Sequence, residues 1–565
     1  MTPSSRSRRV LVDRLVVLAS AVAGGMTIAW WTASGVARTL DSFTYYSVAG
    51  NLHSGKGLTS AFAPLFSDLP FSQQVLHAGR IPLTQWQPGY PVVLAALMSS
   101  GMTVEQAARL AGIMGAALLC GTAAFACRRI LEWNVLATIA FVVLVLVRPN
   151  ALALDVWFFG ASGMALTESV SVPLVFVAVI CAESLVALTS RWVTAALCAL
   201  VVVVTLFRPD GIALGFAIAA THWYRRSRGE TGPGRRQRAL STVAVLLAGP
   251  ITFVLWAKMN EWIWGATATV RSPAWHPSAA VLTETVDSMS GWFSGMNHLD
   301  DPLAVLVVLV GVVGPVAVAL LPATHTRLFT AHPRLGRLAL ICAVTIAAQW
   351  LLVVFTRFML DRTTHIASRY LLPVQVLCYL LIATIASAVF RNRATRPVGT
   401  DRRAKTRMVA SGALALVVWS AMVVPVFRKS STVKAGTADG PRHPLHSLSV
   451  DPSVSVVTNA PETLWSTTHT PVLLLPKPIS VTSGRANTDF SREVDDIARF
   501  ARRRRVVVIT RATLVGSNLS GWPAVERLEQ RHHLVLVRRC SGSVQIWAFR
   551  ASKDSVARLV TCRGR

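Results

Sequence analysis

The dominant pattern along the chain is a series of long apolar runs separated by short basic segments. About eleven runs approach the roughly 20 apolar residues that a helix needs to cross about 30 Å of hydrocarbon. We predict spans at 10–33, 104–127, 134–148, 165–188, 192–207, 209–223, 239–258, 302–322, 338–356, 370–390 and 408–427. The first run is long and lacks a small-residue cleavage site, so it is interpreted as an uncleaved span. The pattern predicts an α-helical polytopic membrane protein with about eleven transmembrane helices.

Basic residues collect at one set of the predicted span ends. Arginine-rich stretches lie at the N-terminus and at 128–129, 225–238, 327–337 and 391–407. With the predicted number of spans, all of them fall on one side of the membrane, which the positive-inside rule identifies as cytoplasmic. We therefore expect a cytoplasmic N-terminus, an extracytoplasmic first loop at 34–103, and an extracytoplasmic tail.

The chain changes character after residue 427, because no later run is long enough to span a membrane. Two helical patterns, at 491–502 and 522–530, alternate with short β-like segments. These segments lie at 453–459, 471–476, 505–511, 533–539 and 544–549. They predict a small α/β domain over 445–565, following a transmembrane domain at 1–427. The linker 428–444 is rich in Lys, Arg, Gly, Ser and Thr, so we expect the domain to hang on a mobile tether.

Composition excludes an ordinary soluble protein, since 53% of the 565 residues are hydrophobic, only 15% are charged and the mean hydropathy is +0.50. In a soluble chain the net charge of +29 would indicate nucleic-acid binding. Here the positive-inside rule and the attraction of basic residues to anionic membrane lipids account for it, and we expect no nucleic-acid partner.

The eight cysteines do not have the spacing of a zinc site. Six of them lie in or beside apolar runs, where they are interpreted as small core residues. Cys540 and Cys562 lie in the hydrophilic tail, and an exported tail would allow them to form a disulfide.

An acidic and aromatic segment, 38–58, follows the first apolar run directly. Its Asp41 emerges within a few residues of the bilayer surface, where a carboxylate is costly unless it has a function. With Tyr45 and Tyr46 beside it, Asp41 could act as a general base toward an acceptor hydroxyl. The alternative is a helix N-cap or a surface charge.

Two further polar features accompany the predicted outer face. Gln85 and Gln87 flank Trp86 before a Pro-Gly-Tyr-Pro turn into an apolar helix. A rigid loop-to-helix junction explains the tryptophan, whereas the two glutamines could bind sugar hydroxyls. Glu168 lies near the outer end of a span, where it is either a functional carboxylate or a helix-start residue favoured by the helix dipole.

Several basic residues lie on the side where the positive-inside rule disfavours them. Arg148, Arg208 and Lys258 fall at predicted outer ends, and Arg369 with Tyr370 opens another span there. Arginine suits bidentate contact with phosphate, so these positions favour a phosphate-bearing ligand. The alternative is that they are boundary residues that snorkel to the membrane surface.

The order of these segments resembles the GT-C superfamily of membrane glycosyltransferases. The segments are LDSFTYYSVAGNLHSGKGL, QWQPGYPVVLAAL, ALTESVSVPL, LFRPDGIAL and SRYLLPV. The nearest branch is the one with protein O-mannosyltransferases and the lipid A aminoarabinose transferase, and the resemblance covers roughly residues 10–390. The tail phrase VVTNAPETLWSTTHTPVLLLP is similar to the exported C-terminal domain of some bacterial members.

The resemblance implies transfer of a sugar from a polyprenyl-phosphate donor to a glycan, lipid or protein acceptor on the extracytoplasmic face, usually with inversion at the anomeric carbon. It implies that Asp41 is the general base and that Arg369 and Tyr370 contact the donor phosphate. The further substrate-binding candidates are Tyr45, His53, Lys56, Gln85, Gln87, Glu168 and Arg208.

The segment departs from the family pattern where Ser42 and Phe43 follow Asp41, because they leave no DxD pair for a divalent metal. Asp155 or Glu168 would have to supply a second carboxylate, so we expect no obligatory metal. A second departure is Gln87, which stands where many relatives have another proline.

Two alternatives belong to other functional classes. A transporter or flippase of lipid-linked glycans would show broken or charged segments at mid-membrane and symmetry between its halves. A membrane-anchored scaffold or sensor would act through residues 428–565, and its membrane part would be catalytically silent.

Overall fold

The chain is described here by a computed structural model. The described residues are 3–33, 35–36, 40–65, 67–83, 86–146, 167–185, 190–227, 235–264, 280–294, 301–359, 371–394, 448–480, 485–511, 522–540 and 544–562.

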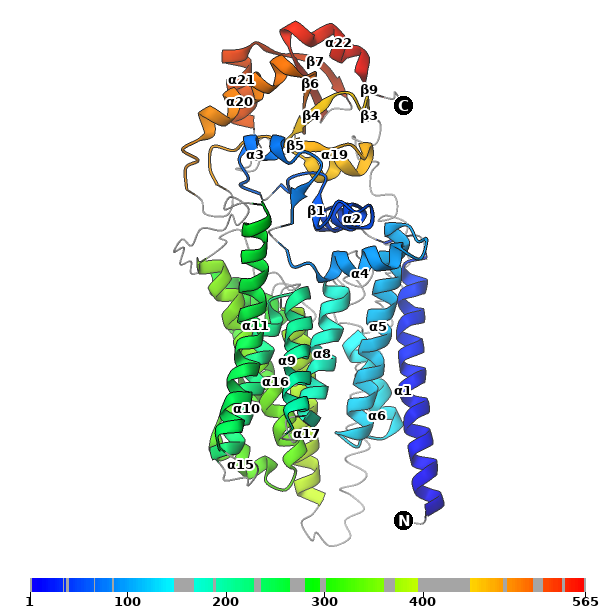
Figure 1. The fold of residues 1–565 in the computed structure, drawn as a ribbon. Helices are drawn as coiled ribbons and strands as arrows, with labels where there is room; N and C mark the ends of the chain where they lie inside the picture. Colours follow the sequence, from blue (N-terminus) through cyan, green and yellow to red (C-terminus); the bar gives the residue numbers. More distant parts are fainter. Residues whose placement is uncertain are drawn as a thin grey trace.

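The membrane part is a bundle of helices, with the N-terminus at one end and the C-terminal sheet domain beyond the other (Figure 1). Each predicted span except the last coincides with a described helix or, for 302–322, with a continuous helical segment. The helices are α1 (Pro3–Trp31), α5 (Val104–Arg129), α6 (Val135–Leu146), α8 (Glu168–Leu185), α9 (Arg191–Phe207), α10 (Asp210–Ser227), α11 (Arg235–Trp264), α13 (Asp301–Val308) with η2 (Leu309–Val313) and α14 (Gly314–Leu320), α16 (Pro333–Met359) and α17 (Leu372–Ala394). The last predicted span, 408–427, lies outside the described residues.

Six described helices are long and apolar enough to cross a membrane, which makes the chain a multi-pass membrane protein. A seventh is added if Leu309–Leu320 and α15 (Pro322–Phe329), which meet at 83°, form one broken span. Helix α6 has 12 residues and measures about 18 Å, less than the hydrocarbon thickness. The count of about eleven spans therefore stays a prediction.

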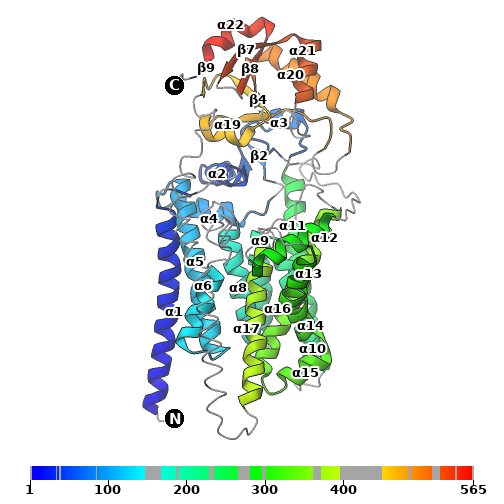
Figure 2. The ribbon, with the colours of Figure 1, turned by 180° about the vertical axis from the view of Figure 1, so that it is seen from behind.

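Arginines at the N-terminal end of the bundle make ion pairs between helices. Arg128 Nη2 lies 2.6 Å from Asp13 Oδ1, which joins α5 to α1. Arg337 Nη2 of α16 lies 2.8 Å from Oε1 of Glu183, a fully buried side chain near the end of α8. The helix ends that carry these arginines lie opposite the C-terminal domain (Figure 2). This grouping is the one expected for a cytoplasmic face.

The C-terminal domain contains a five-stranded mixed sheet of order β5-β4-β6-β8-β7. Its strands are β4 (Ser455–Thr458), β5 (Val472–Leu474), β6 (Val506–Arg511), β7 (Leu534–Cys540) and β8 (Val544–Phe549). Strand β4 pairs in parallel with β5 and β6, and β8 pairs antiparallel with β6 and β7.

The helices of this domain connect strands of the sheet. They are α19 (Pro461–Thr468), α20 (Phe490–Arg503) and α21 (Trp522–His532). The five predicted strands and both predicted helices are confirmed. The structure adds a two-stranded sheet of β3 (Leu448–Val450) and β9 (Val560–Cys562), which follows α22 (Lys553–Leu559).

The segment between α1 and α5 forms a layer of short elements between the bundle and the C-terminal domain (Figure 1). It contains α2 (Leu40–His53), α3 (Phe71–Leu76), α4 (Gly89–Met98) and the two-residue strands β1 (Thr59–Ser60) and β2 (Ile81–Pro82). A capping box ends this layer, because Thr103 and Gln106 bond each other's backbone N–H groups and start α5.

This layer shares a core with the C-terminal domain. Phe62, which is 0% exposed, packs among the sheet residues of that domain and forms a parallel bridge with Val472. The Leu474 N–H donates to Gln74 Oε1 at 2.7 Å. The predicted mobile linker, 428–444, lies outside the described residues. Apolar residues of the first loop complete the core of the C-terminal domain.

The contact between the first loop and the C-terminal domain predicts that Phe62→Ala strongly destabilises the protein. Removing a buried phenylalanine costs about 3–5 kcal/mol, so the thermal unfolding midpoint in detergent should fall and the first loop should become sensitive to protease. The control is Leu76→Ala in the same loop, since Leu76 is 70% exposed. Equal midpoints for the two variants would contradict the shared core.

Candidate active site

Helix α2 carries Asp41 in its first turn, on the layer between the bundle and the C-terminal domain (Figure 1). The Asp41 side chain is half-buried, whereas the following Ser42, Tyr45 and Tyr46 are buried. A carboxylate in the first turn of a helix also interacts favourably with the helix dipole. The position therefore suits both a base that substrate can reach and a residue that stabilises the helix start.

An aromatic cluster lines the buried side of α2. The Tyr45 ring meets the Tyr90 ring edge-to-face, with centroids 5.3 Å apart, and the Trp86 ring at 6.2 Å. Tyr90 is the second residue of α4, so the predicted Pro-Gly-Tyr-Pro turn delivers its aromatic residues to α2. Gln87 is half-buried beside Trp86 in the same turn.

Arg208 lies in the turn between α9 and α10 and forms ion pairs with two carboxylates. Its Nη1 is 2.6 Å from Glu168 Oε1, and its Nε is 3.2 Å from Asp210 Oδ2. The three side chains are only 10%, 5% and 5% exposed. Buried charges of this kind are stable only when paired. Arg208 is therefore the counter-ion of two acidic residues.

Asp41 and the charges of the Arg208 ion cluster both influence the pKa of the Tyr45 hydroxyl. Burial raises the pKa of Tyr45 well above its ordinary value, and the negative charges of Asp41 and Glu168 raise it further. A hydrogen bond with the Thr167 side chain and the charge of Arg208 act in the opposite direction. Tyr45 therefore stays a neutral hydroxyl, able to donate a hydrogen bond, between two carboxylate-bearing elements.

Glycines allow the helices around this cluster to approach closely. A Cβ on Gly89 would lie 2.7 Å from the Leu206 carbonyl oxygen and 2.8 Å from the Phe207 ring. A Cβ on Gly115 would lie 1.9 Å from the carbonyl oxygen of Ser169. The start of α4 thus rests on the end of α9, and α5 rests on the start of α8, next to Arg208 and Glu168.

The other predicted site residues divide into two groups. His53 and Lys56 are exposed near the far end of α2, where His53 lies about 18 Å along the helix axis from Asp41. The structure therefore does not bring them to the Tyr45 cluster. Five residues lie outside the described part of the chain, namely Gln85, Arg148, Asp155, Arg369 and Tyr370.

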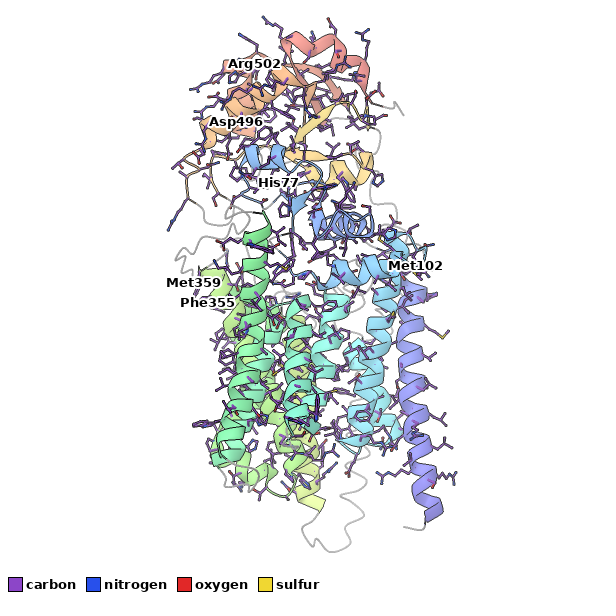
Figure 3. All side chains as sticks on the ribbon, in the orientation of Figure 1. His77, Met102, Phe355, Met359, Asp496 and Arg502 are labelled. Atoms are coloured by element: carbon purple, nitrogen blue, oxygen red, sulfur yellow. The ribbon has the colours of Figure 1, made fainter. Side chains whose placement is uncertain are left out.

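Sequence reasoning missed Asp210 and Arg357. The signal for Asp210 was a carboxylate two residues after Arg208, a spacing that allows an ion pair. Arg357 lies in the last turn of α16, at the outer end of the bundle, between the labelled Phe355 and Met359 (Figure 3). Its Nε and Nη1 are buried without a hydrogen-bond acceptor, and its Nη2 is 4.0 Å from Glu284 Oε1.

Within the described ranges, no group of three His, Cys, Asp or Glu side chains is arranged to hold a metal ion. The expectation of a reaction without an obligatory metal stays a prediction.

Comparison with known proteins gives the following. No protein-family model and no curated protein matches the chain. The crystal structure of ArnT from Cupriavidus metallidurans bound to undecaprenyl phosphate is similar, with a TM-score of 0.48 and 13% identity over 97% of this chain and 98% of that one. The arabinofuranosyltransferase AftD from Mycobacteria gives a TM-score of 0.44 and 12% identity over 95% of this chain and 40% of that one.

The buried ion cluster predicts a strong effect of Arg208→Met. This change leaves Glu168 and Asp210 buried without their cation, at a cost of about 3–5 kcal/mol. The thermal unfolding midpoint in detergent should therefore fall by several degrees. Lys258→Met is the control, because the pair of Lys258 with Glu261 is exposed and contributes little. An Arg208→Met midpoint no lower than that of the control would contradict the counter-ion assignment.

Proposed function

We propose that this protein is a membrane glycosyltransferase that moves a sugar from a polyprenyl-phosphate donor to a cell-envelope glycan, lipid or protein on the extracytoplasmic face. The observation that carries the proposal is the position of Asp41. It is a reachable carboxylate at the outer end of the bundle, next to a buried tyrosine and a buried ion cluster. The sequence resemblance supplies the reaction class.

In the proposed reaction, the Asp41 carboxylate takes the proton of the acceptor hydroxyl. The acceptor oxygen forms a bond to the anomeric carbon of the sugar while the bond from that carbon to the lipid phosphate breaks. The leaving phosphate keeps the electron pair, and displacement from the opposite face inverts the anomeric centre. General-base catalysis of this kind contributes about 10²–10⁴-fold to a rate.

Three residues are proposed to contact the donor phosphate. Arg369 and Tyr370 come from the sequence resemblance, and Arg357 is added because two of its buried nitrogens lack hydrogen-bond acceptors. A guanidinium with free donors suits bidentate contact with phosphate oxygens. Arg208 is not proposed to contact the donor phosphate, because its guanidinium already forms ion pairs with Glu168 and Asp210.

The remaining candidates are proposed as contacts to sugar or acceptor hydroxyls. Tyr45 would donate a hydrogen bond next to Asp41, and Gln87 would act from the turn beside Trp86. Gln85, His53 and Lys56 stay in this set from the sequence, with His53 and Lys56 at the exposed end of α2. Glu168 is proposed to orient Arg208 rather than to contact substrate.

The contact between α2 and the C-terminal domain favours an enzyme over a scaffold. Trp465 of α19 packs against the cluster that contains Tyr45 and Tyr46. A scaffold acting through its tail alone would not need to build that tail against the helix that carries Asp41.

The disulfide supports an extracytoplasmic C-terminal domain, because disulfides persist in oxidising compartments. Cys540 is disulfide-bonded, and the six cysteines at 120, 127, 181, 198, 342 and 378 are free. Cys562 remains the predicted partner. We propose a cytoplasmic N-terminus on the same grounds, since it lies at the opposite end of the bundle (Figure 1).

This assignment predicts the reactivity of the two thiols. In intact cells, a membrane-impermeant maleimide should label Cys540 and Cys562 only after reduction with dithiothreitol. Labelling of Cys540 without reduction would contradict the disulfide, and labelling only after the membrane is opened would contradict the orientation.

The base assignment predicts that Asp41→Asn lowers transfer by about 100-fold or more in proteoliposomes supplied with polyprenyl-phosphate sugars. The amide keeps the size of the side chain and removes its proton acceptor. Glu105→Gln is the matched control, because Glu105 is also a carboxylate in the first turn of an outer helix end. Wild-type transfer by Asp41→Asn would exclude the base role, and equal losses in both variants would reduce Asp41 to a helix-start residue.

A further inference from the structure

The C-terminal domain holds one residue of the first outer loop from both sides. The Leu65 N–H donates to Glu462 Oε1 at 2.5 Å, and Lys477 Nζ donates to the Leu65 carbonyl oxygen. Glu462 is 1% exposed, Lys477 is 6% exposed and Leu65 is 4% exposed. An acid and a base from one domain thus clamp both polar groups of a single loop residue, and water is excluded from the contact.

Glu462 and Lys477 also interact electrostatically with charged residues of the first loop and of α2. The charges that act on Glu462 are those of Lys477 and of Asp41. The charges that act on Lys477 are those of Glu462 and of Asp68. Asp68 Oδ2 in turn accepts from Ser480 Oγ at 2.8 Å. The clamp is therefore electrostatically linked to the proposed base on α2.

Glu462 is also placed by the helix that touches α2. It lies in the first turn of α19, whose Trp465 stacks at 5.4 Å between ring centroids on the buried Phe62. The same Trp465 packs against the Tyr45 cluster. The second carboxylate oxygen of Glu462 is buried and has no hydrogen-bond partner. Such an atom is costly unless the arrangement serves a purpose.

We propose that Glu462 is a positioning residue of the active site. With Lys477, it fixes the loop that follows α2 and thereby sets the position of α2 and Asp41. The catalytic consequence rests on the proposed function, whereas the clamp itself can be tested without any transfer activity. The C-terminal domain is then a structural part of the catalytic unit.

The clamp has a characteristic pH dependence. Burial raises the pKa of Glu462 from 4.5 to about 7, and burial lowers the pKa of Lys477 from 10.5 to about 8. Docking therefore takes up a proton on Glu462, so that its stability falls as the pH rises from about 4.5 to about 7. Docking releases a proton from Lys477, so that its stability rises from about pH 8 to about pH 10.5. The contact is weakest between these two ranges.

The first experiment measures the clamp in the full-length protein in detergent by hydrogen exchange. Glu462→Ala removes the acceptor of the Leu65 N–H, so exchange of that amide and of the α2 amides should become about tenfold faster or more. Glu462→Gln keeps an acceptor and should restore protection. It should also reduce the fall in unfolding midpoint between about pH 4.5 and pH 7, because glutamine does not titrate.

The matched control is Glu493→Gln. Glu493 is another acid of the same domain, and burial raises its pKa to about 7. It lies on α20 and accepts a hydrogen bond from the Asn487 side chain, which precedes that helix. This variant should leave exchange at Leu65 and in α2 unchanged. Equal exchange at Leu65 in Glu462→Ala and Glu493→Gln would overturn the clamp.

The second experiment measures transfer in proteoliposomes with polyprenyl-phosphate sugars. Misplacing a reacting group by about 1 Å costs up to about 100-fold, so Glu462→Ala should lower kcat by about 10- to 100-fold with KM within about threefold. Glu462→Gln should recover most of kcat, because the amide oxygen still accepts from the Leu65 N–H.

These measurements separate the two hypotheses. Faster exchange at Leu65 with an unchanged kcat would overturn the positioning role and leave the glycosyltransferase proposal standing. Faster exchange in α2 together with a wild-type protein that transfers no sugar would support the positioning of α2 and overturn the proposed function.

Discussion

The buried guanidinium of Arg208 constrains the end of the bundle that faces the C-terminal domain. Taking a charge out of water costs several kcal/mol per ion, so Arg208 is tolerated only because Glu168 and Asp210 meet it. The turn between α9 and α10 separates Arg208 and Asp210 by a single proline, and the start of α8 supplies Glu168. Three helices are thus fixed at one point beneath α2.

Gly89 and Gly115 explain how the aromatic residues of the candidate active site come close to the Arg208 ion cluster. Helix α4 could not rest on the end of α9 with a side chain at Gly89, and α5 could not reach α8 with one at Gly115. Because both approaches occur at the outer end, Tyr90 and Trp86 are carried over the ion cluster and against Tyr45. The two glycines therefore allow both the close helix packing and the placement of the polar groups.

Much of the fold followed from local patterns in the sequence. Apolar runs located the helices, and β-branched runs located the five strands of the C-terminal sheet, because both signals are local. The sheet of β3 and β9 was missed, since these strands read LSV and VTC and lack the apolar run that located the equally short β5. The number of spans was not settled by hydropathy, because α6 is too short to decide it.

The candidate site was less predictable because its partners are distant in the chain. Asp41 and Glu168 could be named from their places at span ends, but nothing local joined Glu168 to Arg208, 40 residues later. Phe62 was still harder, since a single phenylalanine in a polar loop looks the same whether it is exposed or buried in another domain. Glu462 was visible only as part of a phrase in the tail, and its contact with Leu65 spans 397 residues.

The two carboxylates near Tyr45 have different environments, which bears on the roles proposed for them. Glu168 is buried, and both of its oxygens are engaged, one by Arg208 at 2.6 Å and the other by Thr167 at 3.2 Å. Accepting a proton there would break an ion pair in a water-poor site. Asp41 is half-buried at a helix start on the outer layer, where an acceptor hydroxyl can reach it. Under the proposed function, this difference in burial favours Asp41 over Glu168 as the base.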